Sequence, residues 1–341
     1  MLTVRKQRIL GTIVDQYVHT SFPVSSDSVA QKITEVVSSA TIRSEMAALE
    51  WDGYITRPHS SAGGVPADKG YRAYVESLPY VQAPNPNVQA LIRHKLQRGQ
   101  MSVETWGRIA SELLSELLRT MAVATLPRTA ESRWKQLNLV QIRDLMTLVI
   151  MVIQGSRIEQ QLLLLHEPMS QHELTRISNK LNRRFSGLSY DEIQYQDMEP
   201  SSIEGQVIDM SLKLLKRDDD HHTPNYYIDG LRHMFNYPEL IEGSKAREMV
   251  HTLEDQKVLS SAFEEVFDTD VVNVAIGKEN KADMLSPFSI IFARYGVPGV
   301  GTGVVGIIGP TRMEYATAIS NVVYLASVMS EMVETVQGQG I

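Results

Sequence analysis

The sequence predicts a mixed α+β protein with a small helical domain at the N-terminus and a larger domain in which strands flank a helical middle. Three observations indicate this division. Short helical patterns fill the first 80 residues, the segment VQAPNPNV (81–88) follows them, and strand-like segments occur on both sides of residues 170–218. Because VQAPNPNV combines prolines and asparagines without any charge, it is typical of a linker that ends a domain.

The N-terminal domain is expected to contain three short helices. Apolar residues recur at helical spacing between Val4 and Tyr17, and Ser26 to Lys32 forms the second predicted helix. The third lies in the stretch VSSATIRSEMAALEWDGYI (37–55) and begins at a serine N-cap, Ser38 or Ser39. A strand, YITRP, and the glycine-rich loop HSSAGGVPADKG follow it. This order of elements is the layout of a winged helix-turn-helix.

The third helix has an outer face without the usual glutamates and lysines. On a wheel of 100° per residue, Ile42, Met46 and Leu49 fall within about 60° of one another and form the predicted buried stripe. The opposite side carries small residues, with one arginine on its flank. Small side chains let a helix enter the DNA major groove, about 12 Å wide, and hydroxyls and an arginine bind phosphates and base edges. The alternative is a helical domain whose exposed face is rich in Ala and Ser without a binding role.

The candidate DNA-binding residues come from this helix, from the second helix and from the loop. In the third helix they are Ser38, Ser39, Ala40, Thr41, Arg43 and Ser44. In the second helix and the predicted wing they are Ser25, Ser26, His59, Ser60, Ser61, Lys69 and Arg72. We expect the loop to form a flexible tip and its two cations to face phosphate. Taken alone, the same loop also fits a solvated hairpin.

The rest of the chain predicts an α+β domain that is interrupted by an insertion. Helical patterns are expected over residues 88–122, 170–218 as helix–loop–helix, 244–267 and Met313 to Val336. Strands are expected over residues 137–142, 145–152, 157–165, 271–277, 288–296 and 303–309. Strands on both sides of a helical middle indicate one domain that holds a second within it.

Composition excludes several classes of protein. The chain has 341 residues with 43% hydrophobic and 21% charged, and no cysteine, so disulfides, thiol nucleophiles and thiolate metal sites are excluded. Its longest apolar run, LMTLVIMVI (145–153), is too short to span a membrane. No secretory signal is evident, so a cytoplasmic protein is the simplest expectation. The net charge is −7, yet the first 80 residues are neutral, which permits nucleic-acid binding without demanding it.

Three short motifs suggest chemistry, but their context does not support it. GTGVVG (301–306) matches a dinucleotide-binding fingerprint, but more strand-like residues follow it, so we expect a hairpin turn. The run DDDHH (218–222) could hold a metal, yet consecutive ligands cannot converge on one ion, so a solvated loop is expected. His59, Ser60 and Asp68 are the residue types of a hydrolase triad, but the sequence has no GxSxG nucleophile elbow around the serine. The sequence therefore predicts no enzyme, no cofactor and no metal.

Both ends of the chain resemble a known family. VSSATIRSEMAALEWDGYI with PHSSAGGVPADKGYRAYVESL resembles the DNA-binding domain of the HrcA family, bacterial heat-inducible transcription repressors. VAIGKEN (274–280) and GVVGIIGPTRMEYATAISNVVYL (303–325) are similar to that family's last strands and helix. One departure lies in the wing, where Gly64 stands in place of the family's usual arginine. This glycine implies fewer phosphate or minor-groove contacts from the wing.

The resemblance implies a fold, a function and partners. The fold is a winged helix, a GAF-like α/β domain and a dimerisation domain inserted within it. The expected boundaries are 1–80 for the winged helix, 81–104 for the linker and connecting helix, 105–165 and 226–341 for the GAF-like domain, and 166–225 for the insertion. The implied function is repression of chaperone operons by a homodimer bound to an inverted-repeat operator in double-stranded DNA, with activity that depends on the GroE chaperonin. A metabolite-sensing repressor that uses the GAF-like pocket is the alternative.

Overall fold

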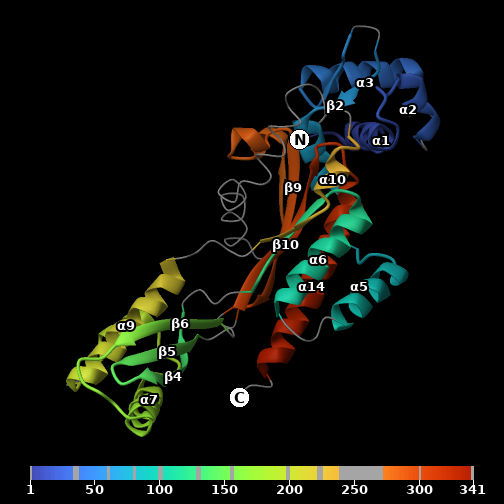
Figure 1. The fold of residues 1–341 in the computed structure, drawn as a ribbon. Helices are drawn as coiled ribbons and strands as arrows, with labels where there is room; N and C mark the ends of the chain where they lie inside the picture. The colour runs from blue at the N-terminus through green and yellow to red at the C-terminus, as the bar shows by residue number, and fades with distance from the viewer. Residues whose placement is uncertain are drawn as a thin grey trace. The chain divides into compact units, whose positions relative to one another are not determined.

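The computed structural model describes residues 2–33, 38–59, 62–79, 82–98, 103–127, 132–153, 157–196, 200–220, 226–237, 272–298 and 301–338. These residues form a mixed α+β fold, which confirms the predicted class (Figure 1). The chain divides into two compact units. The first contains residues 1–126, 225–296 and 303–335, and the second contains 127–224 with two short pieces, 297–302 and 336–341.

The first unit begins with three capped helices, α1 (Val4–Thr20), α2 (Ser26–Lys32) and α3 (Ser39–Trp51). A side-chain oxygen caps each N-terminus, from Thr3, Ser25 and Ser38 respectively, as Ser and Thr commonly do. Their apolar side chains meet in a common core, because α1 and α3 repeat apolar residues at helical spacing and α2 contributes Val29. The fully buried members are Ile9, Leu10, Ile13, Val14, Val29, Ile42, Met46 and Leu49.

A two-stranded antiparallel sheet and a fourth helix complete the N-terminal part. Strands β1 (Ile55–Thr56) and β2 (Val65–Pro66) pair with Ile55 opposite Pro66. Gly64 extends the pairing to Val24, since each backbone amide donates to the other's carbonyl. Helix α4 (Asp68–Ser77) follows and packs against α1. We call residues 2–77, as far as the structure describes them, the N-terminal module.

The remainder of the first unit, which we call the body, is built on a five-stranded sheet in the order β7-β3-β10-β9-β8. Its strands are β3 (Met121–Thr125), β7 (Tyr226–Asp229), β8 (Val272–Ile276), β9 (Phe288–Val297) and β10 (Gly301–Pro310). The helices around it are α5 (Pro86–Arg98), α6 (Val103–Leu118), α10 (Leu231–Met234), α14 (Tyr315–Gly338) and the short turns η1 (Gly277–Glu279) and η2 (Asp283–Leu285). Helix α6 packs on β3 and β7.

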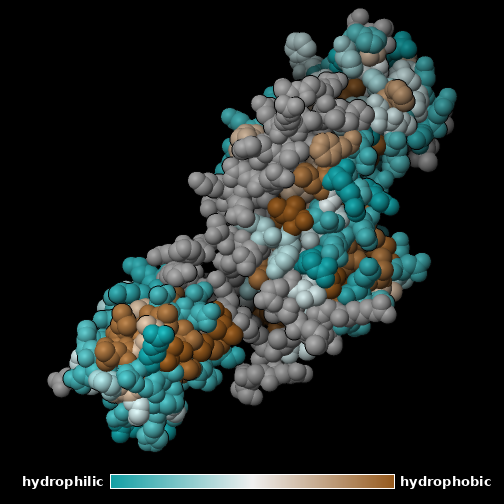
Figure 2. Space-filling model, viewed as in Figure 1, coloured by the Kyte–Doolittle hydropathy of each residue, from teal (hydrophilic) through white to brown (hydrophobic). Residues whose placement is uncertain are grey.

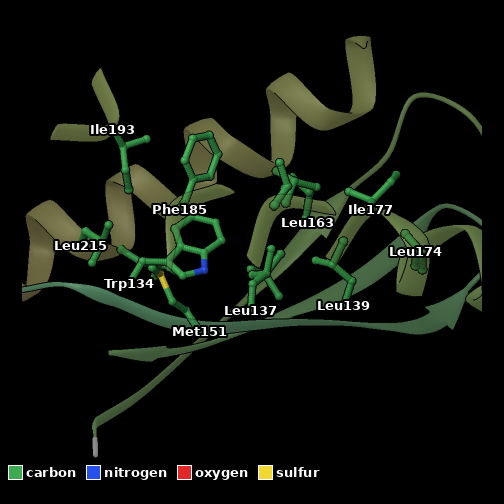
Figure 3. Packing of buried hydrophobic residues seen from close by; sticks show 14 of the residues in the cluster. Trp134, Leu137, Leu139, Met151, Leu163, Leu174, Ile177, Phe185, Ile193 and Leu215 are labelled. Carbon is green, nitrogen blue, oxygen red and sulfur yellow. The ribbon is translucent and has the colours of Figure 1, made fainter. Parts of the chain in front are cut away.

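The second unit is a three-stranded antiparallel sheet with its helices packed on one face. Its elements are β4 (Trp134–Arg143), β5 (Met146–Ile153), β6 (Arg157–Leu164), α7 (Gln171–Phe185), α8 (Tyr190–Gln194) and α9 (Ser202–Asp220). Figure 3 shows inward-facing side chains of the sheet meeting those of the helices, with the Trp134 and Phe185 ring centroids 5.4 Å apart. Asn182 links α7 to β4, because its side chain accepts from Trp134 Nε1 and exchanges hydrogen bonds with the backbone of Leu137.

The opposite face of this sheet remains apolar and exposed. The strands alternate, so residues that do not enter the core point outward. The apolar residues among them are Val140, Ile142, Met146, Leu148, Ile150, Val152, Ile158, Leu162 and Leu164, and we call these the outer apolar face. Figure 2 shows hydrophobic surface gathered over this sheet. Monomeric proteins rarely expose apolar patches of this kind without a binding role.

The structure regroups several predicted segments. Residues 137–165, which the resemblance places in the GAF-like domain, form a separate sheet as far as the structure describes them, and the second unit begins at residue 127 instead of 166. The predicted helix 88–122 ends at Leu118, and residues from Met121 form strand β3. GTGVVG lies inside β10 instead of a turn, and Asp218–Asp220 end helix α9 instead of lying in a loop. His221, His222 and the predicted helix 244–267 lie outside the described residues.

Candidate nucleic-acid interface

Helix α3 has a buried side and an exposed side. Ile42, Met46 and Leu49 are at most 2% exposed and pack toward α1 and α2. The other side presents Ala40, Arg43, Ser44, Ala47 and Trp51 to solvent. Of the nucleic-acid-contacting residues that the sequence predicts here, Ser38 is also exposed, whereas Ser39 and Thr41 are half-buried. The exposed side is therefore narrow near the N-terminus of the helix and carries a single positive charge, that of Arg43.

The N-terminus of α3 has an electrostatic environment that favours an anion. The Ser38 hydroxyl oxygen accepts from the Thr41 amide at 3.2 Å, and the first turn contains no acidic residue. Unpaired amides and the helix dipole make such a terminus favourable for a phosphate. Helix α2 begins similarly, because the exposed Ser25 hydroxyl accepts a hydrogen bond from the Ser28 amide. Its first turn, however, contains the negatively charged Asp27. The anion-binding character is therefore stronger at α3.

The predicted cations of the wing occupy different positions from those expected. Lys69 lies in α4, where its ammonium group donates to the Asp52 carbonyl at 2.8 Å and stacks on the Tyr54 ring. Arg72, also in α4, pairs with Glu279 of the body. Both side chains are held by the protein itself, because α4 folds back onto α1 and β8 and does not extend the wing. Of the predicted wing residues, His59 is exposed, and Ser60 and Ser61 lie outside the described residues.

Two other basic residues of the module, Lys6 and Arg57, are also paired. Lys6 contacts Asp52 at 3.3 Å, and Arg57 contacts Glu50 at 3.1 Å. Arg43 has no ion-pair partner among the residues that the structure describes. This difference leaves Arg43 available on the exposed side of α3. Guanidinium groups bind guanine edges or phosphate through two parallel hydrogen bonds.

One exposed side chain of α3 is not among the predicted contact residues. Trp51, the last residue of the helix, is 92% exposed. On the helical wheel it lies about 20° from Ser44, so the same periodicity that selects the buried stripe places it on the outer face. Aromatic side chains stack on bases or pack against sugars. Trp51 thus extends the candidate surface to the C-terminal end of α3.

Comparisons with known proteins identify the family. The C-terminal domain model of the HrcA protein matches residues 105–319. A heat-inducible transcription repressor HrcA from Dehalococcoides mccartyi is 38% identical, over 99% of this chain and 98% of the relative. The chain belongs to the HrcA family. HrcA proteins of the same description from Herpetosiphon aurantiacus and Chloroflexus aurantiacus are 35% and 31% identical, over 99% and 97% of this chain and 97% and 94% of the relatives.

A solved structure shares the fold. A crystal structure described as that of a hypothetical protein is 21% identical and aligns with a TM-score of 0.64, over 98% of this chain and 99% of that chain. HrcA proteins are transcription repressors and not enzymes, as the sequence predicts. In the described part of the chain, no group of three or more His, Asp or Glu residues could hold a metal ion.

One helix among the described residues is long and apolar enough to cross a membrane. It is residues 315–335 of α14, and half of its most apolar window is buried within the protein. Its buried residues, including Val322, Leu325 and Met329, belong to the core. The pattern is that of a helix whose apolar side is buried within the protein.

Proposed function

We propose that this HrcA-family protein represses heat-shock chaperone operons by binding an inverted-repeat operator in double-stranded DNA as a homodimer. In this proposal the N-terminal module is a winged helix-turn-helix, the five-stranded body is a GAF-like domain, and residues 127–224 form the inserted dimerisation domain. Such a repressor acts in the cytoplasm, where bacterial DNA lies. The relatives are named heat-inducible repressors, so the metabolite-sensing alternative is not favoured.

The exposed side of α3 is the observation that carries the DNA-binding part of the proposal. Ala40, Ser44 and Ala47 keep that side slim, and Arg43 supplies a guanidinium group that no described residue neutralises. A helix of 13 residues is long enough to lie across the major groove with its N-terminal residues at the base edges. Ser38 and the amides of the first turn would then contact a phosphate.

Helix α2 and the small sheet support the same placement. In a helix-turn-helix the first helix crosses the DNA backbone while the second enters the groove, and α2 and α3 are packed against each other in that order. The exposed Ser25 hydroxyl lies at the N-terminus of α2. Strands β1 and β2 form the base of the proposed wing, with His59 at the start of the connecting loop.

The outer apolar face of the second unit supports the homodimer. Cross-strand pairing builds continuous apolar rows on this face, such as Val140–Leu148–Leu162, and Met146 lies opposite Leu164. Ile158 and Leu164 are 66% and 67% exposed, so these side chains would gain from burial against a second copy. A two-fold axis relates two copies of one surface, and the same axis would give two recognition helices and a palindromic site.

The chaperonin part of the proposal rests on the family resemblance. A repressor that needs GroE to reach its active form would lose activity when unfolded proteins occupy the chaperonin. Operator binding requires both half-sites to be engaged together, so a modest loss of active dimer lowers repression steeply.

Titration of DNA with the purified protein tests the proposal. A fluorescent duplex with the inverted repeat found upstream of the host's chaperone operons is compared with a scrambled duplex of equal length and composition. We expect the repeat to bind at least about 1,000-fold more tightly. Affinity should fall steeply between about 50 and 200 mM salt because phosphate contacts release counterions. Equal affinity for the two duplexes would contradict the proposal.

A further inference from the structure

A cluster of polar contacts joins the N-terminal module to the body. Arg72 of α4 lies opposite Glu279, and its Nε donates to Glu279 Oε1 at 2.8 Å. The Nη2 atom of the same guanidinium donates to the second carboxylate oxygen and to the carbonyl of Val274. Two parallel charge-assisted hydrogen bonds fix both the distance and the angle between the groups. Arg72 therefore holds α4 to strand β8 and to the turn that follows it.

A second contact lies one helical turn away on α4. The Asp68 carboxylate accepts from the backbone amide of Lys278 at 3.1 Å. Beside it, Gly277 has a φ of +57°, and a β-carbon there would lie 2.2 Å from the Asp68 carboxylate. Glycine at this position thus permits both the turn and the close approach of Asp68. We call Asp68, Arg72, Glu279 and the backbone of residues 274–278 the α4 clamp.

Further contacts between the module and the body, and a cavity, lie near the clamp. Tyr71 and Tyr315 form a buried ring contact with centroids 5.7 Å apart, and Arg312 donates to the Val18 carbonyl at 3.2 Å. An open cavity of about 960 Å³ lies beside Arg72 and is lined by residues of both parts that include Val75, Leu78 and Ile319. Because side chains do not fill this space, the contacts around it hold the module against the body.

We propose that the α4 clamp is a positioning device that sets the direction in which α3 faces from the body. Arg72 and Glu279 are positioning residues, and they do not touch DNA. This inference rests on the proposed function, because it assigns the clamp to operator binding. A rigid joint keeps the second recognition helix of a dimer near the second half-site once the first is bound. Loosening the joint lowers the effective concentration of the second recognition helix at its half-site, but does not change the contacts of either helix with DNA.

Paired substitutions with a matched control test the role in DNA binding. Arg72→Ala should lower affinity for the full inverted repeat by about tenfold or more, while affinity for a single half-site stays within about twofold. The double substitution Arg72→Glu with Glu279→Arg should restore part of the loss. The control is Arg93→Ala, which removes a similar two-bond pair between Arg93 and Glu331 but leaves the module's joint intact. This control variant should leave the ratio of full-repeat affinity to half-site affinity unchanged.

A distance measurement without DNA tests the joint itself. The chain has no cysteine, so single spin labels can be placed at Ala47→Cys on α3 and at Met284→Cys, which is half exposed on the body. We expect a narrow distance distribution in the otherwise natural protein and a broader one with Arg72→Ala. An unchanged distribution, or equal losses for the full repeat and the half-site, would overturn the positioning role. Equal affinity of the natural protein for repeat and scrambled DNA would instead overturn the proposed function and, with it, the clamp's part in operator binding.

Discussion

The hydroxyl of Ser38 accepts the backbone amide of Thr41 at 3.2 Å, and its oxygen lies 2.9 Å from the Thr41 hydroxyl oxygen. This pair fixes the first turn of α3, whose exposed side carries the proposed DNA contacts. An N-cap satisfies an amide that the helix leaves unpaired. The N-terminus of α3 is therefore capped by a single serine side chain.

Two substitutions of Ser38 should distinguish its effect on protein stability from its effect on DNA affinity. Ser38→Ala should destabilise the protein by about 1 kcal/mol, because the Thr41 amide loses its partner. Ser38→Asp should keep the cap and the stability, but its negative charge should weaken operator binding by repelling phosphate. Chemical denaturation and DNA titration of the two variants check this. Equal operator affinity for the aspartate variant and the natural protein would contradict the placement of Ser38 near phosphate.

Two adjacent glycines in the proposed wing should respond differently to alanine. A β-carbon on Gly63 would lie 2.4 Å from the Val24 backbone, which cannot move without breaking the pairing of Val24 with Gly64. A β-carbon on Gly64 would lie 2.9 Å from the end of the Ile55 side chain, which can rotate. Gly63→Ala should cost about 3 kcal/mol and Gly64→Ala about 1 kcal/mol or less. Thermal unfolding of the two variants measures this order, and a reversed order would contradict the packing.

The outer apolar face predicts how the oligomeric state depends on single residues. Leu162→Glu should weaken the dimer by at least about 30-fold, because a charge buried without a partner costs about 2 kcal/mol or more. Tyr195→Glu serves as the control, since this side chain is 87% exposed at the end of α8 and is not part of the outer apolar face, so the dimer should be unaffected. Analytical ultracentrifugation measures the dimer dissociation constant of each variant. A dimer that persists in Leu162→Glu would show that this face is not the interface.

Stability should fall as the pH decreases through the range in which His233 titrates. Burial lowers the pKa of His233, assisted by the nearby Arg232 and Arg119, and its Nε2 has no hydrogen-bond partner among the described residues. Since the folded state then binds a proton less readily than the unfolded state, acidification below the ordinary histidine pKa of about 6.5 favours unfolding. His233→Gln should flatten the decrease in unfolding temperature between about pH 7 and 5.5 relative to the natural protein. A decrease that is equally steep in the variant and in the natural protein would contradict this assignment.

Local features of the fold could be predicted from the sequence. Helices α2 and α3 begin where serine caps precede apolar residues at helical spacing, and the bounds of α2 match the prediction. Strands β4, β5, β6, β8, β9 and β10 also lie where their apolar patterns indicate them, whereas β3 and β7 were not predicted. Each of these signals comes from neighbours within a few residues.

Features set by distant contacts could not be predicted. Strands β4, β5 and β6 have patterns that fit either sheet, and the partner that a strand chooses is not encoded in its own alternation. The role of Arg72 depends on Glu279, more than 200 positions away in the chain. Strand β3 follows directly on the apolar pattern of α6, so no local boundary marks it. Trp51, in contrast, could have been found from the helical wheel.

Operator discrimination by the Arg43→Ala variant tests the central claim most directly. The affinities for the inverted repeat and for the scrambled duplex are measured side by side for the natural protein and the variant. If the exposed side of α3 contacts base edges, removal of the guanidinium should reduce the ratio of the two affinities by about 10-fold to 100-fold, because a bidentate base contact contributes about 1 to 3 kcal/mol of discrimination. An unchanged ratio would show that α3 does not recognise the operator.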